Sequence, residues 1–494
     1  MSRTSPTRRW LAAAAAVALA AAWWATRPPT PHGSGSDVYT HLCVARHLVQ
    51  GDGFVNDVVY PLSLTFPFAA QVPQPLVHRP PGYPLVMTLP VALAGADTVR
   101  AERLAGHLSL LLLALIAWRG AAHALGRGRG DTVAPWLAVL LVNPLLHMTV
   151  GWSQVEIPVA LLLLWLWTRV RARAGETDGS PSPGSAVVDG LLAAAIALLR
   201  ADLFWLPWLW LLWAGRLRGR PLLVAAACWA GVLAPWWIRT ATVTGHPFFT
   251  LQAYAEHLKQ TPAWPGYSIY ASLSPESFWH TLRHDPDLIL HKTLAGLRYY
   301  LTRLDGWLPL LLWAGGGLAA AARFARGRRP GDPLPVLLVS LAALTLAYAP
   351  LSHTLRYMAV LLPVLSLELW LAVAEALAAR LGGLGGPRLR HGLLLAGAAA
   401  CIWILPARMP GWERARDAAA VSAATLPAAL ERLARIPPGP VFTDSAALLW
   451  HGKRAGVWSA GDPEVEKAIR STIVDMERAP AIRQGPSAGG SGDD

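Results

Sequence analysis

Residues 100–123 read RAERLAGHLSLLLLALIAWRGAAH, and this stretch decides the class of fold. Its centre, Leu110 to Trp118, is an unbroken apolar run, and a helix that crosses a bilayer needs about 20 mostly apolar residues. Arg127 and Arg129 follow it directly, and such basic residues are typical of the short loops between spans. The stretch therefore predicts a membrane-spanning helix with a basic connection after it.

The same pattern recurs along the chain and predicts an all-α polytopic membrane protein with about 11 transmembrane helices. The expected spans are 10–26, 100–123, 132–150, 155–170, 188–200, 202–215, 222–238, 300–322, 334–350, 356–379 and 391–408. The pair 188–200 and 202–215 is also compatible with one kinked helix. The first span shares features with a signal peptide, but Trp23 and Trp24 suit the interface of a helix that is retained.

Composition excludes an ordinary soluble enzyme. Of the 494 residues 54% are hydrophobic and only 15% charged, and the mean hydropathy is +0.36, whereas a typical soluble domain is about 25% charged. The net charge is +13, but the basic residues stand in short clusters between apolar runs and so do not indicate a nucleic-acid surface. Three cysteines are too few for a disulfide framework.

The arginine clusters predict the orientation of the chain, since cytoplasmic loops carry an excess of Arg and Lys. Clusters on alternate connections are Arg127 and Arg129; Arg169, Arg171 and Arg173; Arg216, Arg218 and Arg220; Arg323, Arg326, Arg328 and Arg329; and Arg380, Arg388 and Arg390, and the N-terminal segment has Arg3, Arg8 and Arg9. We therefore expect a cytoplasmic N-terminus and an extracytoplasmic C-terminus. The composition, rich in alanine, arginine and proline, favours a bacterial cytoplasmic (inner) membrane.

This orientation leaves long segments on the extracytoplasmic side. They are the first loop, 27–99, the connection 240–299 and the chain after Arg408. We expect a transmembrane module over 1–410, a small extracytoplasmic α/β domain over 411–484 and a disordered tail over 485–494. Within the small domain, helices are expected near 412–434, 444–451 and 463–478, with a strand at Val441–Phe442.

Six groups of polar residues fall at the extracytoplasmic ends of the predicted spans, where ionisable groups are costly and often functional. They contain Asp37; His78, Arg79 and Tyr83; Glu156; Arg200; Arg239; and His353, Arg356 and Tyr357. Single members also have structural explanations. Asp37 suits a helix N-cap, Arg200 can pair with Asp202, and Arg239 can extend to the membrane surface. Because all six groups are predicted to lie on the same side of the membrane, they favour a shared functional site.

In their order along the chain these segments resemble the polytopic GT-C glycosyltransferases, close to the protein O-mannosyltransferases and the bacterial lipid A aminoarabinose transferases. The matching pieces are Asp37 with Ala45, Leu48 and Gly51-Asp52-Gly53; Arg79-Pro80-Pro81-Gly82-Tyr83-Pro84; Arg103-Leu104; Asn143-Pro144 before Glu156; Leu199-Arg200; Pro235-Trp236-Trp237-Ile238-Arg239 with Gly245; and Arg356-Tyr357 before Leu362-Pro363. The resemblance covers about 1–375.

The resemblance implies transfer of a sugar from a polyprenyl-phosphate carrier to a lipid, glycan or protein acceptor on the extracytoplasmic face. Asp37 matches the acid that activates the acceptor, and we expect it to be the general base. Arg79, Arg239 and Arg356 are expected to hold the leaving phosphate, because a guanidinium group matches phosphate oxygens.

The other polar residues complete the expected substrate-binding set. His78 and His353 are candidates to donate to the phosphate or to hold a divalent metal, and Glu156 is a candidate to orient the acceptor or the sugar. The full set is His78, Arg79, Tyr83, Glu156, Arg200, Arg239, His353, Arg356 and Tyr357.

The chain departs from the family pattern at two positions. Val38 follows Asp37 where many members have a second acid, and Arg79 stands where Lys is common. The first departure argues against a paired-carboxylate site, and the second leaves the identity of the donor open. A phosphodiester is already a fair leaving group, so one acid is chemically sufficient, in contrast to glycoside hydrolysis.

Other functions are compatible with such a chain. The main alternative is a transporter or flippase of a lipid-linked substrate, although transporters tend to contain internal repeats and we find none in the sequence. A scaffold that presents the C-terminal segment would leave the clustered charges unexplained. Among enzymes, a polymerase or ligase of polyprenyl-linked glycans is the nearest competitor.

Overall fold

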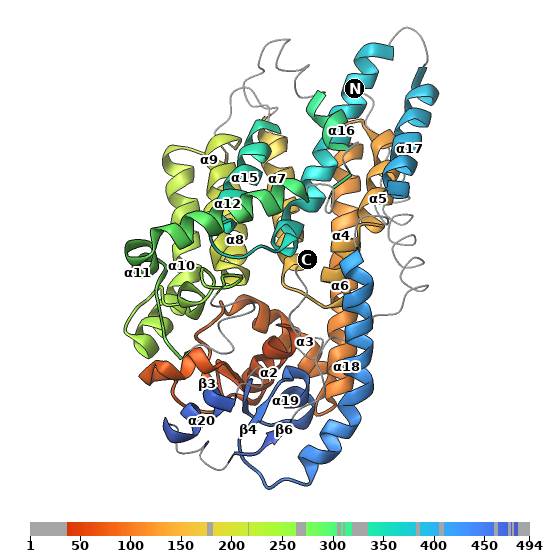
Figure 1. Cartoon of the computed structure of the whole chain (residues 1–494). Helices are drawn as coiled ribbons and strands as arrows, with labels where there is room; N and C mark the ends of the chain where they lie inside the picture. Colours follow the sequence, from red (N-terminus) through yellow and green to blue (C-terminus); the bar gives the residue numbers. More distant parts are fainter. Residues whose placement is uncertain are drawn as a thin grey trace.

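The computed structural model describes residues 37–174, 181–215, 217–262, 273–303, 308–309, 312–318, 334–381, 386–404, 410–458, 463–472, 476 and 479–482. In this part the chain is mainly helical (Figure 1). The predicted first span, 10–26, and the predicted tail, 485–494, lie outside the described residues, as does part of the predicted span 300–322.

Three helices of the described part are long and apolar enough to cross a membrane. They are α4 (Thr98–Gly126), α10 (Gly219–Thr244) and the helix Leu355–Leu381, in which the 3-10 helix η7 (Leu355–Leu361) leads into α16 (Leu362–Leu381). They coincide with three of the predicted spans. The chain is therefore a multi-pass membrane protein, while the total of 11 helices stays a prediction.

The predicted span 132–150 is not one straight helix. It consists of a helical stretch Gly130–Leu141, in which the 3-10 helix η3 (Gly130–Thr132) leads into α5 (Val133–Leu141), and of α6 (Pro144–Gly151). The two stretches are bent by 63°, and only together are they long and apolar enough to form a fourth span. Asn143 explains the break, because its side chain accepts hydrogen bonds from the amides of Leu145 and Leu146 at 3.0 and 3.2 Å and so caps α6. Pro144 occupies the first helical position, where no donor is lost.

The other predicted spans that the structure describes are shorter or less apolar. They are α7 (Glu156–Ala174), α8 (Pro183–Leu199), α9 (Trp205–Trp213), α15 (Leu334–Tyr348) and α17 (Gly386–Ile404). A 3-10 helix, η4 (Ala201–Leu203), separates α8 from α9. The helices α8 and α10 approach closely, since a Cβ atom on Gly190 would lie 2.3 Å from the carbonyl oxygen of Ala225.

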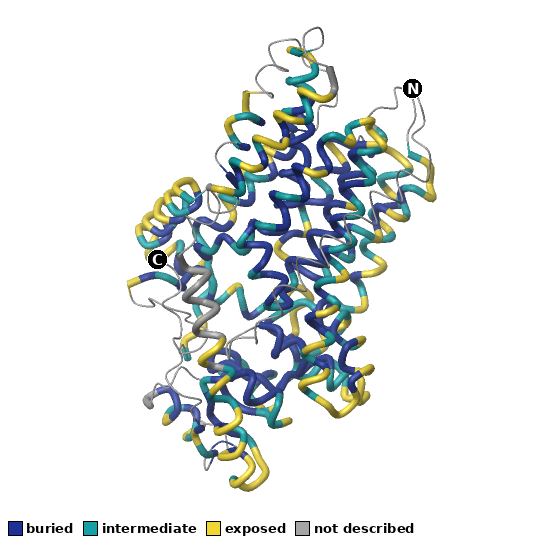
Figure 2. Tube along the Cα trace, turned by 90° about the vertical axis from the view of Figure 1, so that its right-hand side faces the viewer, coloured by how far each residue is buried: buried dark blue, intermediate teal, exposed yellow. Residues whose placement is uncertain are grey.

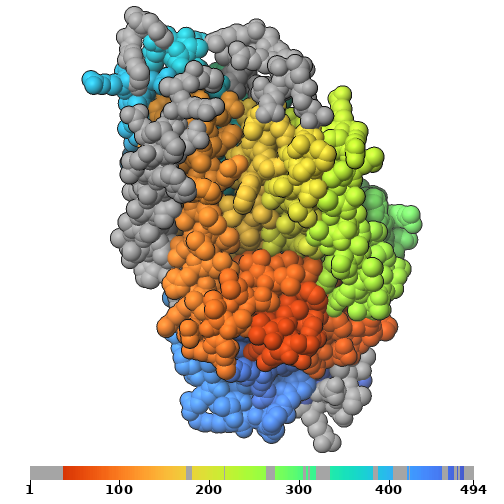
Figure 3. Space-filling model, turned by 180° about the vertical axis from the view of Figure 1, so that it is seen from behind, coloured from red at the N-terminus to blue at the C-terminus, as the bar shows by residue number. Residues whose placement is uncertain are grey.

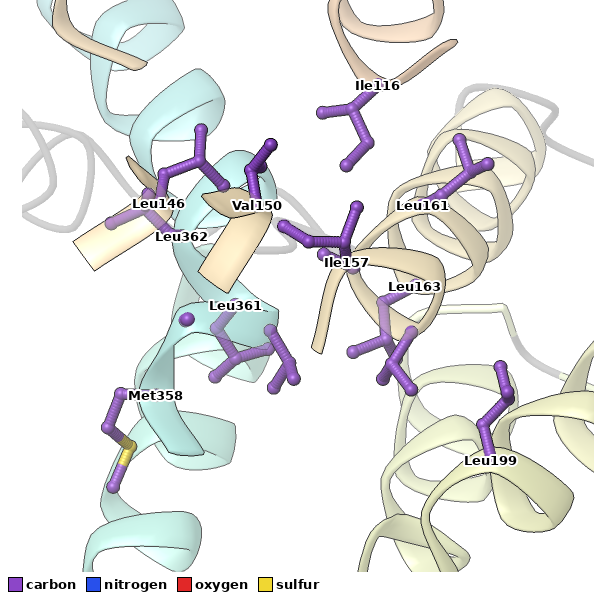
Figure 4. Close-up of a cluster of buried hydrophobic side chains, with 14 of the residues drawn as sticks. Ile116, Leu146, Val150, Ile157, Leu161, Leu163, Leu199, Met358, Leu361 and Leu362 are labelled. Atoms are coloured by element: carbon purple, nitrogen blue, oxygen red, sulfur yellow. The ribbon is translucent and has the colours of Figure 1, made fainter. Parts of the chain in front are cut away.

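The core of the helical part is apolar and surrounds α7 (Figure 4). Ile157, Leu161 and Leu163 of α7 belong to one cluster of buried side chains, whose other labelled members in Figure 4 are Ile116, Leu146, Val150, Leu199, Met358, Leu361 and Leu362. Buried positions fill the interior of the bundle in Figure 2. On α10, by contrast, Leu223 and Ile238 are 70% and 67% exposed, as expected for a helix that faces lipid.

The first loop folds at one end of the bundle, beside the C-terminal segment (Figures 1 and 3). The first loop comprises α2 (Asp37–Gln50), β1 (Val55–Asn56), β2 (Val58–Val59), η1 (Pro61–Thr65), η2 (Pro67–Ala69), β3 (Gln74–Pro75) and α3 (Gly82–Ala94). The C-terminal segment comprises α18 (Pro410–Ala434), β4 (Val441–Thr443), α19 (Ala446–Gly452), β5 (Gly456–Trp458), α20 (Pro463–Thr472) and β6 (Ala481–Ile482).

One small sheet joins these two segments. Its strand order is β2-β5-β4-β6, and every pairing is parallel. Val58 lies opposite Gly456, so a strand of the first loop completes a sheet whose other strands come from the C-terminal segment. The predicted domain boundary at 411 stays a prediction, although the sheet contains strands from both sides of it.

Candidate active site

Asp37 is the centre of the candidate site. It is the first residue of α2 and is only 9% exposed. Arg79 donates to its Oδ1 at 2.5 Å, and Arg356 donates to its Oδ2 at 3.0 Å. The carboxylate is therefore held between two guanidinium groups that are distant in sequence.

The local sequence explains how these three residues are presented. Arg79 precedes Pro80 and Pro81, which restrict the backbone just before α3 begins at Gly82. Arg356 lies in η7, at the start of a long apolar span. The side chains of Arg79 and Arg356 keep 18% and 21% of their surface exposed, so both are mostly buried, and the Nε atom of each is covered.

Charge compensation decides the ionisation of this part of the site. Burial by itself raises the pKa of Asp37, but Arg79 and Arg356 more than offset this effect and hold the pKa of the carboxyl well below its usual range. Burial, with Arg79 nearby, lowers the pKa of His41 to about 3. At neutral pH Asp37 is therefore a carboxylate and His41 a neutral imidazole.

Glu156 is connected to the same group of charges. It is 1% exposed at the start of α7, and its Oε1 lies 3.3 Å from Nε of Arg356 and 3.2 Å from a terminal nitrogen of Arg200. Its other oxygen, Oε2, is buried without a hydrogen-bond partner among the described residues. Arg356 thus bridges two acids, Asp37 and Glu156.

Arg200 extends the network to two tyrosines. It donates to Asp202 at 2.6 Å, as the sequence suggested, and to the hydroxyl of Tyr348 at 3.1 Å. Its guanidinium carbon lies 4.6 Å from the centre of the Tyr357 ring. The structure therefore brings Asp37, Arg79, Glu156, Arg200, Arg356 and Tyr357 together in one network of ion pairs and ring contacts.

Tyr83 lies beside this network. Its hydroxyl donates to the carbonyl oxygen of Ser153, and its ring meets that of His41 edge-on at 4.8 Å. Ser153 has φ of 48°, a left-handed conformation that costs energy for a residue with a side chain. The contact from Tyr83 holds the short turn between α6 and α7, and therefore the start of α7 where Glu156 stands.

His78 is next to the network but is covered. It is 1% exposed, packs against the Tyr60 ring at 5.0 Å, and neither ring nitrogen has a hydrogen-bond partner among the described residues. Burial lowers its pKa well below the ordinary value. A neutral, covered imidazole is poorly placed to supply positive charge, so a phosphate-binding role for His78 stays a prediction.

Arg239 and His353 also lie outside the network as the structure describes it. Arg239 donates to the backbone carbonyl oxygens of Leu76 and Phe54 at 2.5 and 3.2 Å and stacks on Trp236. Nε2 of His353 lies within hydrogen-bond distance, 3.0 Å, of the carbonyl oxygen of Ala349. The contacts of Arg239 support the backbone of the first loop. Their roles in substrate binding stay predictions.

Sequence reasoning missed two members of the site. His41 stands one helical turn after Asp37 and lies 3.4 Å from Arg79, and its i, i+4 spacing from the acid was an available signal. Tyr348 donates to Asp202 from α15. No local pattern marks it, because its partner is about 150 residues away in sequence.

The donor set of the site fits an anion better than a divalent metal. Within the described ranges no three His, Cys, Asp or Glu side chains come together as metal ligands. The acids Asp37 and Glu156 are paired with guanidinium groups, whose positive charge opposes a bound cation. The nitrogen Nε of Arg79 is a buried donor without a partner among the described residues.

The arrangement of helices and outer layer is that of the membrane GT-C fold, as the resemblance in the sequence predicted. No protein-family model matches the sequence, and no curated protein matches it. The similarity is therefore in three-dimensional structure. At such low sequence identities it shows the fold alone.

Three solved structures illustrate it. ArnT from Cupriavidus metallidurans bound to undecaprenyl phosphate is 15% identical, with a TM-score of 0.55, over 97% of this chain and 90% of ArnT. The Archaeoglobus fulgidus oligosaccharyltransferase tethered to an acceptor peptide is 12% identical, with a TM-score of 0.56, over 93% of this chain and 64% of that protein. The same archaeal enzyme, AglB, in complex with an inhibitory peptide and a dolichol-phosphate has a TM-score of 0.52 and 12% identity, over 92% of this chain and 65% of that protein.

Proposed function

We propose that the chain is a membrane glycosyltransferase that moves a sugar from a polyprenyl-phosphate carrier to an acceptor on the extracytoplasmic face of a bacterial cytoplasmic membrane. The observation that carries the proposal is the buried Asp37 carboxylate held between Arg79 and Arg356. The GT-C fold supports it, since solved structures of that fold include proteins bound to undecaprenyl phosphate and to a dolichol-phosphate.

The proposed reaction uses Asp37 as the base. An acceptor hydroxyl or amine gives its proton to the carboxylate and attacks the anomeric carbon of the donor sugar. The bond between the anomeric carbon and the phosphate oxygen breaks, and its electron pair stays on the leaving polyprenyl phosphate. Arg79 and Arg356 stabilise the negative charge that develops on that phosphate.

The same arginines link base strength to donor binding. In the unliganded arrangement their charge lowers the pKa of Asp37 and makes it a weak base. A phosphate that takes up hydrogen bonds from Arg79 and Arg356 offsets part of this positive charge, so the pKa of Asp37 rises towards its ordinary value. Asp37 would then become an effective base only when a donor is bound.

Glu156 and Arg200 form the second part of the proposed site. The Oε2 of Glu156, which has no hydrogen-bond partner in the described part of the chain, would accept a hydrogen bond from a hydroxyl or amino group of the sugar or the acceptor. Arg200, held by Asp202 and Tyr357, fixes the direction of the Glu156 carboxylate. No step of this mechanism passes through a metal ion, because the donor set of the site suits an anion better than a cation.

A transporter or flippase of a lipid-linked substrate is the alternative, and one experiment separates it from a transferase. The lipid-linked sugar that accumulates in a strain lacking the protein is isolated, labelled in both sugar and lipid, and supplied to the purified protein in vesicles with an extract of cell-envelope acceptors. A transferase separates the two labels, and free polyprenyl phosphate appears. A flippase moves both labels across the bilayer on one molecule, and that result would refute the proposal.

A further inference from the structure

The C-terminal helix α19 packs against α2, the helix that begins with Asp37. In Figure 1 α19 lies next to α2, and in Figure 3 the C-terminal segment lies directly below the first loop. The amide of Gly456 donates to the carbonyl oxygen of Asp57 at 2.9 Å, where β5 joins β2. The two segments therefore form one continuous layer.

A chain of hydrogen bonds runs from α19 to the first turn of α2. Nε2 of His451 lies 3.0 Å from Oε2 of Glu102, and Oε1 of Glu102 accepts from the hydroxyl of Tyr39 at 2.9 Å. Nδ1 of His451 lies 3.0 Å from the hydroxyl of Thr98. Tyr39 is two residues after Asp37, so this chain ends within one helical turn of the proposed base.

A second contact holds the middle of α2. Arg46 donates to the carbonyl oxygen of Trp450 at 3.0 Å, and its guanidinium carbon lies 5.0 Å from the centre of the Trp450 ring. Arg46 also pairs with Asp57 at 2.6 Å. Trp450 is 1% exposed and donates through its indole nitrogen to the carbonyl oxygen of Thr98 at 3.3 Å. Trp450 therefore contacts both α2 and the start of α4.

We propose that His451 and Trp450 are positioning residues that fix α2 against α4 and so hold the Asp37 carboxylate at the reacting atoms. The inference rests on the proposed function and gives the C-terminal segment a role in it. The segment acts on the chemical step through α2, and donor binding by Arg79 and Arg356 does not depend on it. Misplacement of a catalytic group by about 1 Å can cost about 100-fold in rate.

The test compares two variants of His451 in the purified full-length protein. In His451→Ala both hydrogen bonds to α4 are lost, whereas in His451→Gln a side-chain amide remains that can donate to Glu102. The control is Glu431→Gln on α18, where an exposed pair with Arg435 is removed from the same segment. For each protein kcat and KM are measured with the isolated lipid-linked sugar, and amide hydrogen exchange is measured over α2.

We expect His451→Ala to lower kcat about 10- to 100-fold with little change in KM, and to speed exchange in α2 more than elsewhere. His451→Gln should restore most of kcat, and Glu431→Gln should behave as wild type. Wild-type kcat in His451→Ala, unchanged exchange in α2, or equally faster exchange along the whole chain would overturn the inference. If the wild-type protein transfers no sugar, the proposed function fails, and exchange in α2 alone decides whether His451 positions the helix.

Discussion

Arg356 is shared by two acids, and this sharing shapes the chemistry of the site. Its terminal nitrogen meets Asp37 at 3.0 Å while its Nε lies 3.3 Å from Glu156. A planar guanidinium group can serve both carboxylates at once because its donors point in fixed, different directions. Any ligand phosphate that draws Arg356 away from the acids changes the charge felt by both.

Substitution of Arg356 by lysine tests this shared contact. A lysine ammonium is a single point charge and cannot hold both acids in the same geometry. We expect Arg356→Lys to fold and to lose about 10- to 100-fold in kcat/KM for the lipid-linked donor, about 1.4–2.8 kcal/mol. The control is Arg435→Lys, an exposed position on the C-terminal segment. Equal kcat/KM for Arg356→Lys and wild type would contradict the account.

Much of the site could be predicted residue by residue, because buried charge at a membrane surface is rare enough to be informative. Asp37, Arg79, Glu156, Arg200 and Arg356 were selected from their positions together with the family resemblance, and they lie in one network. Their roles stay predictions. Arg239 shows where such reasoning stops. A guanidinium that binds backbone carbonyl oxygens, as Arg239 does, looks the same in sequence as one that binds phosphate.

His47 should make the stability of the first loop depend on pH. A hydrogen bond to Asp57 raises the pKa of His47 above its ordinary value of 6.5. The stabilisation is therefore complete below pH 6.5 and is lost as the pH rises through the higher folded-state value. We expect Tm to fall between about pH 6 and about pH 8, and to fall less in His47→Gln. The Asp57→Asn variant should show the same reduced fall in Tm. An identical fall in Tm in the wild type, His47→Gln and Asp57→Asn would rule out the His47–Asp57 pair as its cause.

At the scale of elements, the bend between α5 and α6 and the close approach of α8 to α10 are set by single residues. The Asn143-Pro144 pair carries a recognisable cap signal, yet hydropathy alone joined both helices into one span. The count of spans could not be derived for a similar reason. Helices such as α9 and α15 are apolar but shorter than a bilayer requires. Whether they count as spans therefore depends on how they pack against neighbouring helices, which hydropathy does not show.

Substitution of Gly190 tests the close packing of α8 on α10. A Cβ atom there would lie 2.3 Å from the backbone oxygen of Ala225, and backbone cannot move aside as a flexible side chain can. We expect Gly190→Ala to destabilise the protein by about 1–3 kcal/mol, which is typical of overpacking. Gly231→Ala on α10 is the matched control, because nothing lies within 4 Å of its Cβ position. Thermal unfolding in detergent measures both, and equal Tm values would refute the close approach.

At the scale of the whole molecule, the first loop and the C-terminal segment share a sheet. Sequence patterns identify strands such as Val441–Phe442 but not their partners, because a two-residue strand like β2 has too few residues to show alternation. The pairing of Val58 with Gly456 is a contact between opposite ends of the chain. Only the assembled fold reveals that the C-terminal segment adjoins the candidate site.

The orientation of the whole chain in the membrane is tested by accessibility. In a background without Cys43, Cys228 and Cys401, single cysteines replace Glu431 and Arg129. We expect a membrane-impermeant maleimide to label Glu431→Cys in intact cells and Arg129→Cys only after permeabilisation, because basic loops are retained in the cytoplasm. The opposite pattern would place the candidate site on the cytoplasmic face and contradict the proposed donor and acceptor.

The most direct test of the central claim is the rate of sugar transfer by Asp37→Asn with the isolated lipid-linked donor. The substitution keeps the shape of the side chain and removes the base, so we predict a rate about 100- to 10,000-fold below wild type. Asp97→Asn is the control, because asparagine caps α4 as well as aspartate does, and it should transfer at the wild-type rate. Transfer by Asp37→Asn at the wild-type rate would contradict the account.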